Sequence, residues 1–64
     1  MSELKRARLA KKWSGQQLSK LMNVTKQTIS NWENGKFEPN INQLSRLALL
    51  LETDVEKIMN DFIK

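Results

Sequence analysis

The chain has 64 residues, a net charge of +4, seven basic side chains against one acidic in residues 1–31, and neither cysteine nor histidine. These two absences exclude a disulfide framework and a thiolate metal site, and remove the commonest catalytic base. We therefore expect one small domain over residues 1–64 that is not an enzyme, holds no metal or cofactor, and presents its basic half to a polyanion, although ordinary solubilising charge gives a similar composition.

A first helix is predicted from about residue 2 to residue 12. Its apolar spacing directs three residues toward the core, namely Leu4, Ala7 and Leu9. A second helix is predicted over residues 14–22, where Ser14 and Gln17 have the spacing of a capping box. Asn23 follows in the turn, and we expect it to adopt the left-handed backbone that Asn tolerates best after Gly.

A third helix is predicted to begin after Thr25, which serves as its N-cap. Val24 and Ile29 stand at the positions of a hydrophobic staple, which fixes the angle at which the chain enters the helix. The pair Asn34-Gly35 is a typical C-terminal signal, so the helix is expected to end there.

A fourth helix is predicted after Asn40, which forms a second capping box with Gln43. Its core face has helical spacing and comprises Ile41, Leu44, Leu47, Ala48 and Leu51. Thr53-Asp54 opens a fifth helix with a narrow apolar stripe of Val55, Ile58, Met59 and Phe62, so the last two helices cover about residues 40–63. The sequence predicts an all-α fold, a compact five-helix bundle with a helix-turn-helix at about residues 14–34.

The outward face of the third helix carries amides, a hydroxyl and an ammonium, and no carboxylate. At about 100° per residue, Lys26, Gln27 and Asn31 lie on this face, whereas Ile29 and Trp32 lie on the back. Gln and Asn pair well with adenine in the DNA major groove, and Lys with the acceptors of guanine. A merely solvated helix has a similar face, but the capped helix and tight turn before it favour a DNA-reading element. We expect Lys26, Gln27 and Asn31 to contact bases.

Contacts with phosphates set the register of such a protein on DNA. The candidates are Thr28, Asn34 and Lys36, together with the backbone amides at the start of the second helix.

These segments resemble the Xre-type helix-turn-helix family, which comprises phage lambda-type repressors, Cro proteins and their bacterial relatives. The resemblance extends from about Leu4 to Met59 and is most specific in LSKLMNVTKQTISNWENGKFEPN and LALLLETDVEKIM. It implies a compact helical bundle that binds a palindromic operator in double-stranded DNA as a homodimer. It also places the predicted base and phosphate contacts at positions where relatives make them.

The resemblance further implies an ion pair between Arg8 of the first helix and Glu33 at the end of the third. Relatives usually begin the second helix with a Gln that contacts phosphate. This chain has Gly15 there, and Gln16 is the candidate to replace that contact. Relatives often end the fourth helix at a Gly where this chain has Glu52, so a tighter or a strained joint between the fourth and fifth helices is expected.

Four apolar residues exceed what so small an interior readily buries: Leu49, Met59, Phe62 and Ile63. We expect them to form part of a homodimer interface, although they can instead cover the floor of the bundle.

The sequence thus predicts a sequence-specific DNA-binding transcriptional regulator, specifically a repressor, with no small-molecule ligand. The alternative is a protein-interaction module, such as an antitoxin-like partner, that acts mainly through the last two helices. No apolar segment approaches the ~20 residues of a membrane span, and no signal peptide is evident. We therefore expect no membrane association and a cytoplasmic, nucleoid-associated protein.

Overall fold

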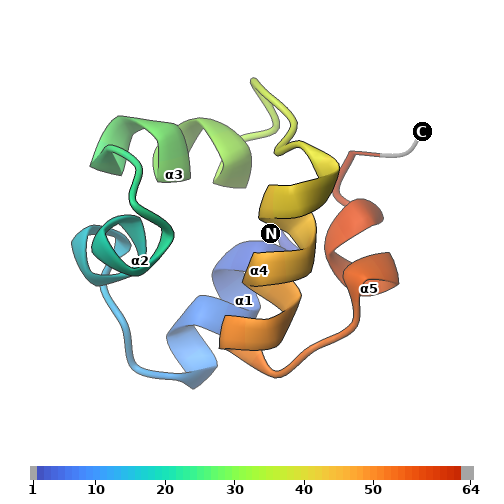
Figure 1. Cartoon of the computed structure of the whole chain (residues 1–64), viewed down its shortest axis with the longest axis horizontal. Helices are drawn as coiled ribbons and strands as arrows, with labels where there is room; N and C mark the ends of the chain where they lie inside the picture. The colour runs from blue at the N-terminus through green and yellow to red at the C-terminus, as the bar shows by residue number, and fades with distance from the viewer. Residues whose placement is uncertain (1, 63–64) are drawn as a thin grey trace.

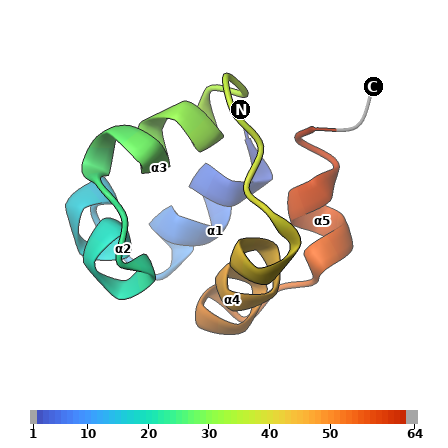
Figure 2. The same ribbon diagram turned by 45° about the horizontal axis from the view of Figure 1, so that its top comes forward.

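The computed structural model describes residues 2–62, and within this range the chain forms five helices and no strand. They are α1 (Glu3–Ala10), α2 (Gly15–Met22), α3 (Lys26–Glu33), α4 (Ile41–Leu51) and α5 (Val55–Met59). α2 and α3 lie along one side of the molecule and α5 along the other, with α1 and α4 between them (Figures 1 and 2). The prediction of an all-α helical bundle is confirmed.

Side chains satisfy the backbone at the starts of α2, α3 and α4. At α2, the Ser14 hydroxyl accepts the backbone N–H of Gln17 at 3.1 Å, and the Gln17 amide oxygen accepts the N–H of Ser14 at 2.7 Å. Asn40 and Gln43 exchange the same two bonds at α4, each 2.8 Å long. Thr25 caps α3 through its side chain. Because these are local interactions, each helix start is encoded within four residues of sequence.

A residue with left-handed backbone follows each of three helices, α1, α2 and α4. Asn23 ends α2 with a φ of 58°, as predicted. Lys12 has a φ of 61° and turns the chain after α1, which ends at Ala10 and not at residue 12 as expected. Glu52 ends α4 with a φ of 53°. A left-handed backbone costs a residue with a Cβ about 1–2 kcal/mol, so the expected strain at Glu52 is present in the backbone.

The core is a cluster of buried apolar side chains to which every helix contributes: Leu4, Leu18, Met22, Ile29, Trp32, Leu44, Leu47, Ala48, Leu51 and Ile58. Trp13 and Phe62 pack against it from its edge. α3 therefore contributes its back to the same core that holds α4 and α5 together, and this shared core fixes the position of α3.

Two residues expected in the core lie outside it. Ile41 is 65% exposed and Leu9 is 50% exposed. Ile41 opens α4 at the rim of the buried stripe, about 60° from the nearest fully internal position, Leu44. Leu9 lies about 140° around α1 from Leu4, whereas Arg8 lies only about 40° from it. The inward position on α1 is therefore taken by a charged residue.

Asp61, which follows α5, caps the start of α1. Its two carboxylate oxygens accept the backbone N–H groups of Glu3 at 2.9 Å and Leu4 at 3.1 Å. The Ser2 hydroxyl accepts the next N–H, that of Lys5, at 2.9 Å. The first turn of α1 is thus satisfied partly by a residue from the other end of the chain, which ties α5 to α1.

Replacing Asp61 by Ala is expected to lower the free energy of unfolding by about 1–2 kcal/mol, because two N–H groups of α1 lose a charged acceptor. Urea unfolding followed through the fluorescence of the buried Trp32 measures the change. Asp54→Ala is the matched control, since Asp54 precedes α5 without a side-chain capping bond. Equal losses in the two variants would show that the Asp61 contact does not contribute to stability.

Candidate nucleic-acid interface

α3 is supported from behind by α2. Leu18 and Met22 of α2 are buried, as are Ile29 and Trp32 of α3. The short turn through Asn23 joins the two helices, and Figure 2 shows α3 along the edge of the molecule. The apolar back of α3 is therefore fixed against the body, while its opposite face is open.

This open face of α3 carries two rows of hydrogen-bonded polar side chains. Gln27 Nε2 donates to Asn31 Oδ1 at 3.1 Å, and Asn34 Nδ2 donates to Ser30 Oγ at 3.3 Å. Lys26 and Gln27 are exposed and Asn31 is half-buried. Partners four residues apart lie one above the other on a helix, so each row runs along the axis of α3.

The predicted phosphate contacts lie around this face. Asn34 and Lys36 are exposed at the C-terminal end of α3, and Gln16 is exposed in the first turn of α2. Thr28 is half-buried, and both its backbone N–H and its hydroxyl are bonded to the Thr25 hydroxyl, at 3.1 and 2.9 Å. Thr28 therefore takes part in the cap of α3 and has fewer free polar atoms than the other three.

The only acidic residue of α3, Glu33, is turned away from the polar face and pairs with Arg8. Arg8 Nε lies 2.7 Å from Glu33 Oε2 and Arg8 Nη2 lies 3.2 Å from Glu33 Oε1. A third donor, Arg8 Nη1, bonds to the Trp13 carbonyl oxygen at 2.8 Å. The two side chains are only 10% and 11% exposed. This bidentate ion pair connects α3 to α1. Because the Glu33 carboxylate is held on the inner side, the open face of α3 carries no carboxylate that would repel phosphate.

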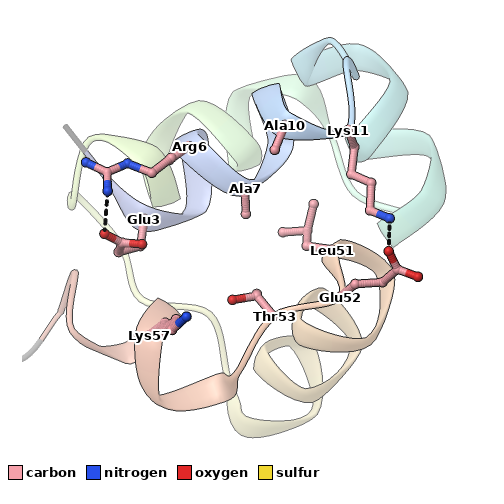
Figure 3. A pocket seen from close by; sticks show the side chains of 9 residues that line it. All are labelled: Glu3, Arg6, Ala7, Ala10, Lys11, Leu51, Glu52, Thr53 and Lys57. Atoms are coloured by element: carbon pink, nitrogen blue, oxygen red, sulfur yellow. Dashed lines mark hydrogen bonds and ion pairs between the residues drawn. The ribbon is translucent and has the colours of Figure 1, made fainter.

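A cleft of about 440 Å³ lies between α1, the joint of α4 and α5, and α5 (Figure 3). Ion pairs join four of the five charged side chains that line it, Arg6 with Glu3 at 3.5 Å and Lys11 with Glu52. The hydrogen bond and charge of Lys11 hold the pKa of Glu52 below its ordinary value of 4.5. That pair stabilises the fold above pH 4.5 and is lost as the pH falls through the lowered pKa. The cleft contains no residue of α3.

The apolar residues expected at a dimer interface do not share one environment. Leu49 is 79% exposed on α4, the highest value among the large apolar side chains described. Met59 and Phe62 are half-buried and pack against the core. Ile63 lies outside the described residues. Ile41 and Phe37, each 65% exposed, are apolar surface that the sequence pattern did not indicate.

The sequence pattern also missed two contacts that hold the helices in place. Asp61 caps α1, as described above, and Arg46 of α4 donates to the Leu21 carbonyl oxygen of α2 through Nη2 at 3.2 Å. Both contacts join residues far apart in the chain, 57 or 58 residues in one case and 25 in the other. No spacing motif signals them. Among the described residues, no group of acidic side chains, cysteines or histidines is arranged to hold a metal ion.

Comparison with known proteins places this geometry in a family. A family model described as helix-turn-helix matches residues 4–58, which is most of the chain and includes all five helices except the last residue of α5 and the first of α1. No curated protein and no solved structure matches significantly. Among the described residues, no helix is long and apolar enough to cross a membrane.

Proposed function

Since the chain belongs to the Xre-like helix-turn-helix family of DNA-binding regulators, we propose that it recognises a specific operator in double-stranded DNA by inserting α3 into the major groove. The observation that carries this proposal is the open face of α3, which holds amides and an ammonium while its one carboxylate is paired on the inner side. An α-helix of this kind fits the width of the major groove.

In this proposal Lys26, Gln27 and Asn31 contact base edges. Phosphate contacts come from Gln16, Thr28, Asn34 and Lys36. The supporting observation is their placement: the base-reading candidates lie on α3, and Thr28 lies on the same helix. Asn34 and Lys36 follow the last residue of α3, and Gln16 lies in the first turn of α2. Phosphate contacts position a protein on DNA, whereas base contacts give it specificity.

We further propose that the protein is a repressor acting by occupancy as a homodimer on a palindromic operator, in the cytoplasm at the nucleoid. Two copies related by a two-fold axis would present their α3 helices roughly 34 Å apart, one turn of DNA. The exposed Leu49 supports the binding of a second copy at the surface of α4, because a large apolar side chain exposed to water favours association.

Selection from a pool of random duplexes tests the proposal. We expect an enriched site with two inverted half-sites, centred about 10 base pairs apart. A pool that shows no enrichment at any salt concentration would contradict specific recognition. Enrichment of a single half-site would contradict the dimer alone.

Asn31→Ala is expected to weaken binding to the selected site by about 1–3 kcal/mol, with little change on random DNA, because the lost contact is to a base. Titrations of both duplexes at one salt concentration give the comparison. Equal losses on the two duplexes would contradict the role of Asn31.

Lys36→Ala provides the contrast for this measurement. Loss of a phosphate contact should weaken binding to both duplexes alike and reduce the slope of log K against log salt by about one unit.

A second candidate is a protein-interaction module acting through α4 and α5, and the exposure of Leu49 favours it as well. The two candidates differ on DNA. A module of this kind should bind selected and random duplexes equally, with only a salt-dependent attraction.

A further inference from the structure

The hydrogen bond between Gln27 and Asn31 restricts what each amide can offer to DNA. Gln27 Nε2 donates one of its two hydrogens to Asn31 Oδ1 at 3.1 Å. Gln27 keeps one N–H and its amide oxygen, a donor and an acceptor side by side. Asn31 turns its oxygen along the helix toward Gln27, so its amino group points away from that bond. The two amides therefore present different chemistry.

We propose that these two residues act as one coupled unit, in which the orientation of Gln27 decides the base that Asn31 selects. This inference rests on the proposed function. Gln27 presents the donor–acceptor pattern that matches the N7 and N6 groups of adenine. Asn31 presents an amino group, which matches a base edge with acceptors, above all the O6 and N7 of guanine.

The second hydrogen-bonded pair on the open face, Asn34 with Ser30, does not fix the orientation of an amide in this way. Asn34 donates to a hydroxyl, that of Ser30, at 3.3 Å. A hydroxyl rotates and both donates and accepts, so it does not impose one orientation on its partner. The Gln27–Asn31 bond joins two planar amides whose oxygen and nitrogen ends are not interchangeable. Water competes for this bond on a free helix, whereas a groove that excludes water strengthens it.

Gln27→Glu is the decisive variant, because a carboxylate cannot donate to Asn31 Oδ1. The Asn31 amide is then expected to turn, donate to Glu at position 27, and present its oxygen to the DNA. Its own base should change from guanine to one with an outward donor, the N4 of cytosine or the N6 of adenine. Base preference thus changes at a position read by a residue that was not substituted.

The experiment selects sites from random duplexes with the wild-type protein, Gln27→Glu, Asn31→Ala and the double variant. We expect Gln27→Glu to invert the base preference by about tenfold or more at the base pair read by Asn31. In the Asn31→Ala background the same substitution should leave that position unchanged. Gln27→Met, which neither donates nor accepts through an amide, is the uncharged control and should broaden the preference there without inverting it.

The outcomes separate the two proposals. If the wild-type protein enriches no site, both specific recognition and the coupled pair are overturned. If it enriches a site and Gln27→Glu alters only the position read by residue 27, the coupled pair is overturned and the proposed function stands. A circular dichroism spectrum and a thermal melt of each variant establish that it is folded under the conditions of the selection.

Discussion

Replacing Glu33 by Ala is expected to lower the free energy of unfolding by about 3–5 kcal/mol, because it leaves the Arg8 guanidinium buried without its partner. Arg8 is 8% exposed, and two of its nitrogens bond to Glu33. A chain of this length has a total stability of only about 3–10 kcal/mol. We expect a protein that is largely unfolded at 37 °C, measurable by urea titration at low temperature.

The double variant Arg8→Met with Glu33→Leu separates two quantities. One is the cost of leaving a buried charge unpaired, and the other is the net contribution of the ion pair to the free energy of unfolding. Replacing both charges by apolar groups of similar volume removes the unpaired ion, so most of the lost stability should return. Arg6→Ala is the control for an exposed pair, because Arg6 is 65% exposed beside Glu3, and it should cost less than about 1 kcal/mol. If Glu33→Ala costs no more than Arg6→Ala, the pair does not brace α3 against α1.

Ile29→Ala is expected to cost about 2–5 kcal/mol through a cavity between α3 and the core, while leaving base preference unchanged. Ile29 is 1% exposed and lies about 160° around α3 from Gln27. Its loss removes support without altering the face that meets the DNA. In a domain of this size we expect the melting temperature to fall by roughly 10 °C or more.

A site selection performed well below that melting temperature tests the second half of this prediction. The enriched sequence should match that of the wild-type protein, and excess operator should raise the melting temperature of the variant by mass action. Ile29→Val, which removes one methylene, is the graded control and should cost about 0.5–1.5 kcal/mol. If the folded variant selects a different sequence under these conditions, Ile29 contributes to recognition directly.

Much of the candidate site, and of the fold that positions it, was predictable because both depend on contacts between neighbours in sequence. Ser14 with Gln17 and Asn40 with Gln43 encode helix starts within four residues, and Asn23 encodes the turn. The period of α3 then separates polar from apolar positions. The same reasoning failed at Ile41 and Leu9, where an apolar residue follows the helical period but no neighbouring helix covers it. Helical periodicity predicts the direction in which a side chain points. It does not predict whether another helix lies there to cover it.

The sequence alone determined that this chain forms a capped helix, a tight turn and a second helix with a polar face, because capping, backbone preference and helical period act over a few residues. Only the tertiary structure decided which far-apart groups meet. Asp61 reaches α1, Arg46 reaches α2, and Lys11 reaches Glu52, each across at least 25 residues. Their side chains are ordinary surface charges in the sequence, and only the packing of the helices brings them to their partners.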